Sequence, residues 1–264
     1  MDQAERWSEL KDLWPHAPIR EFSIPQILPE KICSLGQVEE IADSIRKEWS
    51  LGFNPISNVI SMLETQGILI IITDAGSQHD FDGLQTKIGN QPIIVCIDYD
   101  DGARQRFTLA HELGHLLLQN RIGADMDEEN VCNRFAGALL LPSSIVQEHF
   151  GKKRNTLEFQ ELYYLKHRFG ISMQACLRRA ADLSIISQNT YTSMMIEFSK
   201  RGWRKSEPEK PYPKEGTQVF RSLVFRALGE GLIGESKAAE LLKEPLMQFH
   251  RERSLELFHA ASHQ

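Results

Sequence analysis

Cysteine is scarce in this sequence, and no long apolar run is present. The four cysteines among 264 residues are widely spaced and form no CxxC pair, which excludes a disulfide scaffold and predicts reduced, mostly buried thiols. The longest apolar stretches, at 68–72 and 93–97, are far shorter than the roughly 20 residues that span a bilayer. The polar, acidic N-terminus has no signal-peptide core. We therefore expect a cytoplasmic protein without a membrane partner.

The net charge of −6 argues against a general nucleic-acid binder, although the charge is unevenly distributed. Residues 152–214 contain 13 Lys and Arg against 6 Asp and Glu, a local charge of +7, so the rest of the chain carries −13. Solvated helix surfaces are the simpler explanation of this excess. The alternative is a docking surface for an acidic partner or for DNA.

The apolar pattern predicts a small sheet followed by helices. Short β-branched runs at 68–73 and 93–97 predict buried strands, and the alternating stretch 84–88 predicts a half-exposed strand between them. Turn residues at 89–92 predict a hairpin. Apolar residues lie nearly all round the segment 106–118, as in a buried helix. We therefore expect an α+β fold in which a three-stranded sheet packs on that helix, followed by a mostly helical C-terminal half.

Proline, glycine and helix-capping residues predict where further elements begin and end. Proline and charge at 204–216 predict a linker, and the stretch 217–261 has a helical pattern again. Helix starts or stops are predicted at Asn54, Gly67, Ser172 and Ser187.

Residues 111–115 read His-Glu-Leu-Gly-His, the HExxH pattern of zinc peptidases. Residues four apart lie on the same face of an α-helix, so His111 and His115 can bind one metal ion. Glu112 is rotated off that face but stays close enough to act as the general base toward a metal-bound water. The alternative, a buried apolar helix with two satisfied histidines and no metal, is the less favoured interpretation.

A catalytic zinc usually has three protein ligands and one open position, so a third ligand is needed. Glu129 is favoured, because on a helix that begins at Asp127 it shares a face with Cys132 and Ala136, whose small side chains allow a close approach to the first helix. Cys132 is the rival, since a thiolate is a strong zinc ligand. The neighbouring carboxylates at 125, 127 and 128 are the remaining alternatives, although helix capping and first-turn charge explain them better.

Two stretches of the sequence resemble the ImmA/IrrE family of bacterial metallo-endopeptidases. They are Arg-Phe-Thr-Leu-Ala-His-Glu-Leu-Gly-His at 106–115 and Glu-Asn-Val-Cys-Asn-Arg-Phe-Ala at 129–136, with Leu-Leu-Leu-Pro following at 139–142. Cys132 and Leu141 stand where the family usually has Ala and Met. Weaker resemblance extends the similar region to residues 45–205.

The resemblance implies a zincin-like metallopeptidase core. His111, His115 and Glu129 match the family's metal ligands and Glu112 matches its catalytic base. The implied ion is Zn²⁺, with Mn²⁺ as the alternative. We expect a lead-in over 1–50, the peptidase domain over 51–205, and a linker with a helical tail over 206–264. Many relatives carry an N-terminal helix-turn-helix domain, for which we expect no room here.

By the same resemblance, the substrate is a helix-turn-helix repressor, often encoded beside the peptidase, whose loss switches on stress or mobile-element genes. The alternative is a regulator that binds DNA or a repressor without cutting it and keeps a structural metal, or a toxin–antitoxin component. Residues 236–250 resemble a helix-turn-helix element, but a plain helical hairpin is favoured because its acidic residues would lie near phosphates. DNA binding is therefore not favoured.

Two further features bear on the expected chemistry. The strand at 84–88 is the candidate sheet edge on which an extended substrate would be added. Tyr163, Tyr164 and His167 are candidates for stabilising an oxyanion, and the sequence offers no choice among them.

Overall fold

The structure is a computed structural model that describes residues 3–14, 18, 20–73, 83–88 and 91–254. It contains two compact units, one made of Glu21–Gly216 and the other of Met1–Arg20 with Thr217–Gln264. The boundaries predicted at residues 50 and 205 divide the chain differently and stay a prediction. Within the described ranges, no helix combines the length and the apolar character needed to cross a bilayer.

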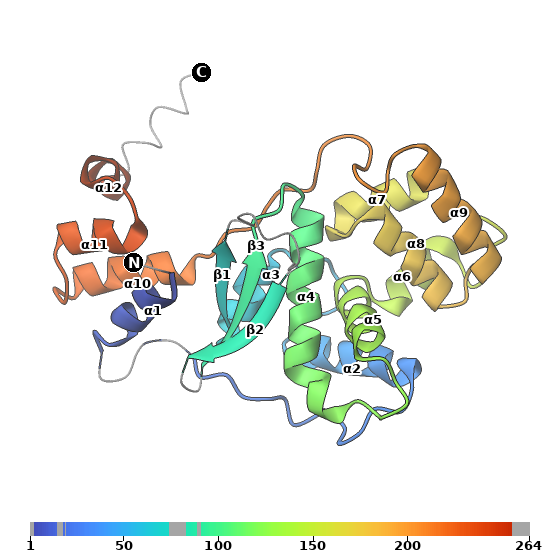
Figure 1. Cartoon of the computed structure of the whole chain (residues 1–264), viewed down its shortest axis with the longest axis horizontal. Helices are drawn as coiled ribbons and strands as arrows, with labels where there is room; N and C mark the ends of the chain where they lie inside the picture. Colours follow the sequence, from blue (N-terminus) through green and yellow to red (C-terminus); the bar gives the residue numbers. More distant parts are fainter. Residues whose placement is uncertain (1–2, 15–17, 19, 74–82, 89–90, 255–264) are drawn as a thin grey trace. The chain divides into compact units, whose positions relative to one another are not determined.

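The larger unit contains a three-stranded mixed sheet with strand order β1-β3-β2 (Figure 1). β1 (Leu69–Thr73) runs parallel to β3 (Gln91–Ile97), and β2 (Gly83–Ile88) runs antiparallel to β3. β3 is central and buried at almost every residue, which explains why its sequence is a continuous apolar run. The predicted antiparallel pairing of β2 with β3 is confirmed, although the turn at 89–90 lies outside the described residues.

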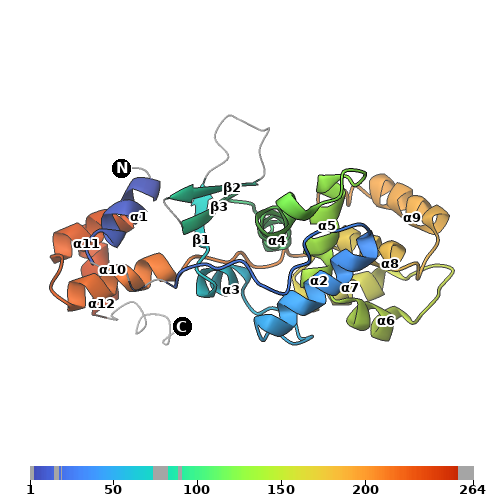
Figure 2. The ribbon, with the colours of Figure 1, turned by 90° about the horizontal axis from the view of Figure 1, so that it is seen from below.

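Helix α4 (Gly102–Leu118) packs on this sheet, and α5 (Glu128–Leu140) packs on another side of α4 (Figure 2). Asp101 starts α4 by accepting a hydrogen bond from the Ala103 amide at 2.8 Å. α4 is buried on most of its faces because α3 (Val59–Thr65) also packs on it. The expected α+β fold, with the sheet against the HExxH helix, is confirmed.

The remaining helices of this unit are α2 (Leu35–Glu48), which packs on α5, and the C-terminal set α6 (Ser143–Phe150), α7 (Phe159–Phe169), α8 (Met173–Asp182) and α9 (Gln188–Lys200). The predicted caps at Ser172 and Ser187 are confirmed, since each side chain accepts an amide hydrogen bond at 3.1 Å. The predicted start at Asn54 is wrong: α3 begins four residues later, with Asn58 accepting from the Ser61 amide.

Three buried cations of the larger unit are paired with acids far away in sequence. Arg106 on α4 pairs with Glu215, Lys166 on α7 pairs with Glu207 at 2.9 Å, and Arg179 on α8 pairs with Glu39 at 2.5 Å; the exposed fractions of the three cationic side chains are 0%, 1% and 2%. Each charge would be very costly to bury alone. These pairs therefore join the two ends of the larger unit to its middle.

The segment predicted to be a linker contributes two of those acids. Residues 203–216 contain no helix or strand, as expected of a connection, yet the segment is packed. The Glu215 carboxylate also accepts from the Val59 and Ile60 amides at 2.7 and 3.0 Å, and the Gly102 amide donates to the Tyr212 carbonyl at 2.9 Å. The segment thus fixes the start of α3 and the start of α4 in one arrangement.

The smaller unit is a separate helical bundle. Its helices are α1 (Gln3–Lys11), α10 (Val219–Gly229), α11 (Glu235–Leu242) and α12 (Leu246–Arg253). Trp7 packs edge-on against Phe220 with ring centroids 4.8 Å apart, and the buried Arg6 donates to the Leu241 carbonyl at 2.6 Å. On α12, His250 and Arg253 contact Glu235 of α11, which favours the predicted helical hairpin over a surface that offers these side chains to phosphates.

Candidate metal centre

His111 and His115 lie one above the other on α4 with their Nε2 atoms 3.0 Å apart. The four-residue spacing places them on the same face of the helix, at the side where α5 begins. Both side chains are 15% exposed, so the two nitrogens are reachable but largely shielded from solvent. Burial is the main cause that lowers the pKa of His111, and the neighbouring His115 adds to it. The neutral ring is the form that binds metal.

Glu129, in the first turn of α5, completes a group of three donors. Its Oε2 lies 3.3 Å from His111 Nε2 and its Oε1 lies 3.4 Å from His115 Nε2. One donor atom from each residue lies within 4.8 Å of the others, which suits a single ion. The structure therefore brings together the three residues that the sequence singled out as ligands.

Two helices can come this close because small residues face each other between them. A Cβ atom on Gly114 of α4 would lie 3.2 Å from the Cα of Cys132 on α5, tighter than an ordinary contact. The glycine inside the HExxH pattern thus lets α5 approach until Glu129 reaches the histidines. The predicted role of Cys132 as a small contact residue agrees with this packing.

Glu112 is buried beside the group, with 7% of the residue exposed. Burial is the main cause that raises the pKa of its carboxyl; His115 opposes the shift and Glu129 adds to it. Gly83, the first residue of β2, passes over this side chain, since a Cβ there would lie 3.0 Å from Glu112 Oε1 and 2.8 Å from Thr108 Cγ2. Gly83 was not predicted from the sequence, although a glycine in a strand often marks a close approach of another group.

Residues 63–181 match the model of a peptidase family described as the IrrE N-terminal-like domain. This stretch of the chain belongs to that metallopeptidase family. Among solved structures, a Mycobacterium tuberculosis transcriptional regulator is similar, at 16% identity and a TM-score of 0.41, over 55% of this chain and 46% of that one. None of the curated proteins compared matches the sequence.

Glu128 of the IrrE-like domain makes a contact that was not predicted. From the sequence, this residue was explained only as negative charge in the first turn of a helix. Its Oε1 lies 2.7 Å from His115 Nδ1. A carboxylate accepts, so Nδ1 donates this hydrogen, and the neutral form of such a ring keeps the Nε2 lone pair that can bind a metal. The corresponding Nδ1 of His111 is buried and has no hydrogen-bond partner among the described residues. The adjacent carboxylates at 128 and 129 thus lie at the two nitrogens of the same ring, Glu128 at Nδ1 and Glu129 at Nε2 of His115.

The donor set of the IrrE-like domain fits a divalent metal. Two imidazole nitrogens and one carboxylate form the His₂Glu set found in catalytic zinc sites. Cys132 is not in the group; its thiol is buried, and burial together with nearby carboxylates raises its pKa, which disfavours the thiolate that would bind zinc. Asp127 caps α5 by accepting from the Asn130 amide at 2.8 Å, as the capping interpretation predicted.

The oxyanion candidates of the IrrE-like domain have other contacts. Tyr163 donates a hydrogen bond from its hydroxyl to Glu209, and its ring lies tilted against that of His167 with ring centroids 4.4 Å apart. Tyr164 is 61% exposed. These contacts support no assignment among the three.

We expect Glu128→Ala to weaken metal binding about 10- to 100-fold, the usual effect of removing the group that orients a histidine ligand. The exposed Glu148 on α6 offers a matched control, because Glu148→Ala removes the same charge away from the group. Competition with a fluorescent zinc chelator measures both dissociation constants. Equal affinities for the two variants would show that Glu128 does not orient His115.

Proposed function

We propose that the chain is a zinc-dependent endopeptidase that cleaves one regulatory protein, with His111, His115 and Glu129 as metal ligands and Glu112 as general base. The observation that carries this proposal is the three-donor group beside a buried carboxylate, within a metallopeptidase domain. Zn²⁺ suits two imidazoles and one carboxylate, and Mn²⁺ is the alternative ion.

The metal ligands, Glu112 and Glu128 have different roles in the proposed hydrolysis of a peptide bond. When bound, zinc would supply Lewis acidity that polarises the substrate carbonyl and acidifies water. Glu112 accepts the proton of the attacking water on its carboxylate and delivers it to the amine that leaves. Burial of Glu112 favours the first step, since a raised pKa makes the carboxylate a better proton acceptor. Glu128 keeps His115 in the tautomer that leaves Nε2 available.

β2 is the proposed binding edge for the substrate backbone. It lies at one edge of the sheet, so one side of the strand is not paired with β3, and an extended peptide can add to it as a further strand. Its first residue, Gly83, lies against Glu112. A peptide on this edge would therefore run past the general base and the donor group.

The proposed substrate is a helix-turn-helix repressor, an assignment that rests on the family resemblance. Cleavage of such a protein would place the chain in gene regulation and stress response. A narrow substrate range agrees with the buried position of Glu112, because shielded groups demand a substrate segment that can reach them.

The test is incubation of the purified chain with the protein encoded by the adjacent gene. We expect cleavage at one or a few bonds with Zn²⁺, none after treatment with a chelator, and recovery when Zn²⁺ is restored; recovery only with Mn²⁺ would identify the alternative ion. Glu129→Ala should abolish both metal retention and cleavage. Unchanged cleavage in the chelator would overturn the proposal.

A further inference from the structure

The two histidines of the metal centre differ in what lies at Nδ1. Glu128 Oε1 lies 2.7 Å from His115 Nδ1, whereas His111 Nδ1 is buried and has no hydrogen-bond partner among the residues that the structure describes. A neutral imidazole that binds a metal through Nε2 carries its hydrogen on Nδ1. Burying such a donor without an acceptor is costly. The metal-bound form of the centre therefore needs an acceptor at His111 Nδ1.

Asn133 is the residue of α5 that is placed to supply this acceptor. It follows Glu129 by four residues, so the two side chains share a face of α5 and differ by one turn, about 5.4 Å. In the first turn of α5, Glu128 lies at His115 and Glu129 lies at both histidines. One turn later, the Asn133 side chain contacts His111. The helix thus presents a series of polar side chains to the two rings.

Two other polar groups near the His111 ring lie at its Nε2 atom. His115 Nε2 lies 3.0 Å and Glu129 Oε2 lies 3.3 Å from that atom. Burial is the main cause that lowers the pKa of His111, and the contact with the Asn133 side chain is among the causes that oppose this shift. The contact is not a hydrogen bond of ordinary geometry at Nδ1, because that atom is left without a partner. Asn133 is therefore the neighbouring polar side chain that remains for Nδ1.

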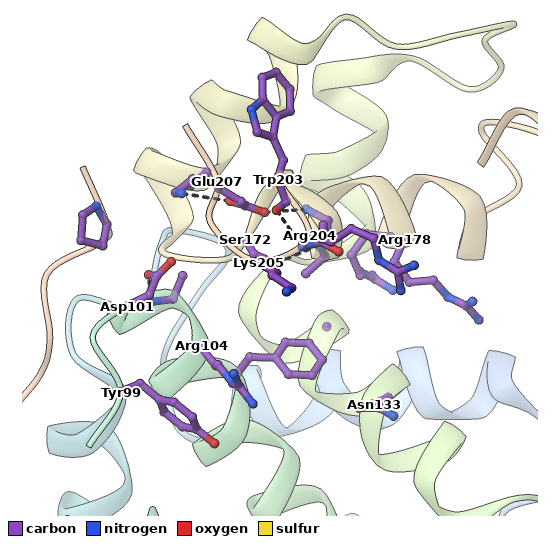
Figure 3. Close-up of a pocket in the computed structure, with 18 of the residues that line it drawn as sticks. Tyr99, Asp101, Arg104, Asn133, Ser172, Arg178, Trp203, Arg204, Lys205 and Glu207 are labelled. Carbon is purple, nitrogen blue, oxygen red and sulfur yellow. Dashed lines mark hydrogen bonds and ion pairs between the residues drawn. The ribbon is translucent and has the colours of Figure 1, made fainter. Parts of the chain in front are cut away.

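The position of Asn133 leaves its side chain free to complete this hydrogen bond. The residue is exposed and, unlike the three proposed metal ligands, it lines an open depression whose lining includes residues of α4, α5 and α8 (Figure 3). Its carboxamide therefore has solvent on one side and the His111 ring on the other. Exposed side chains change rotamer rapidly. A rotation about the side-chain bonds can thus bring Oδ1, the acceptor of this side chain, to Nδ1 of the ring.

We propose that Asn133 is the positioning residue of His111 and that its side-chain oxygen accepts the Nδ1 hydrogen of the ring in the zinc-bound protein. Glu128 makes the equivalent contact to His115. This inference rests on the metal site of the proposed function and adds a residue that acts through one of the ligands. Such a contact fixes the rotation of the ring and the tautomer that presents Nε2 to the ion. Because the carboxamide is uncharged, it orients the ring without adding negative charge beside the carboxylates of the centre.

Zinc affinity is the first measurement, made by competition with a fluorescent zinc chelator. Asn133→Leu removes the acceptor with little change in size and should weaken zinc binding about 10- to 100-fold, the usual effect of losing a group that orients a histidine ligand. Asn133→Asp keeps an oxygen acceptor at the same place and should retain most of the affinity. The matched control is Asn130→Leu, the same change at an exposed position of α5, and it should bind zinc normally.

Nitrogen-15 NMR of the imidazole rings in the zinc-loaded protein is the second measurement, and a general loss of stability would not reproduce its expected result. A hydrogen-bonded Nδ1–H exchanges slowly with water and gives a resolved signal. Asn133→Leu should remove the signal of His111 and keep that of His115. Glu128→Ala should do the reverse, so each variant should remove a different signal.

Three results would overturn the inference: equal zinc affinity of Asn133→Leu and Asn130→Leu, an Asn133→Asp variant that binds zinc as weakly as Asn133→Leu, or loss of the same NMR signal in Asn133→Leu and Glu128→Ala. Failure of the proposed function is recognised separately. An unsubstituted protein that binds no zinc would overturn both proposals. A protein that binds zinc and gives the expected signals, yet cleaves no partner protein, would support the role of Asn133 and overturn the endopeptidase proposal alone.

Discussion

Glu112→Gln should keep the metal and lose peptide hydrolysis by at least about a thousandfold, the range expected when a general base is removed. The amide has nearly the same shape as the carboxylate but cannot accept the proton of the attacking water. Glu112 is not among the three donors, so metal affinity should change little. The measurement is the rate of cleavage of the protein substrate, together with the zinc content of each variant.

The control for this experiment is Glu148→Gln, the same chemical change at an exposed site on α6. It should keep full activity. If Glu112→Gln cleaves at the normal rate, another group is the base and the proposed mechanism is wrong. If the variant loses its zinc as well, the carboxylate contributes to the metal site rather than to proton transfer.

Arg106→Met should destabilise the larger unit by about 3–5 kcal/mol, because it leaves a buried acid without its cation. The guanidinium is fully buried; besides pairing with Glu215 it donates to the carbonyls of Gly170, Phe169 and Ile56. Removing it breaks four contacts among segments that surround the start of α4. Urea denaturation followed by circular dichroism gives the free energy of unfolding.

Two further variants separate the buried charge from simpler effects. Arg104→Met removes an exposed arginine from the same helix and should cost about 1 kcal/mol or less. In the double variant Arg106→Met/Glu215→Leu no buried charge is left alone, so part of the loss should be recovered. A loss below about 1 kcal/mol for Arg106→Met would show that this ion pair contributes little to the stability of the fold.

Local patterns in the sequence predicted the elements that local physics determines. The four-residue spacing of His111 and His115, the β-branched runs of the strands, and the caps at Ser172 and Ser187 each depend on neighbouring residues, and each agrees with the structure. Helix α6 was not predicted, although Pro142 stands directly before its first residue.

Two features that depend on distant residues were not predicted. Glu128 looked like ordinary helix-start charge, and only the approach of α5 to α4 brings it to His115. Glu215 lay in a stretch whose composition indicates a linker, and its burial depends on the position of α3 and α4. The composition of a segment indicates whether it is polar enough to be exposed. It does not indicate that one of its acids pairs with a buried cation far away in the sequence.

The three buried ion pairs bear on where a self-sufficient peptidase unit begins and ends. Arg106, Lys166 and Arg179 all lie within the family-matched stretch 63–181, whereas their partners Glu215, Glu207 and Glu39 all lie outside it. A fragment trimmed to 63–181 would have to bury three cations without their counter-charges. The smallest stretch that retains these partners spans residues 39–215. The part of the chain needed to fold with its buried charges paired is therefore longer than the part that matches the family.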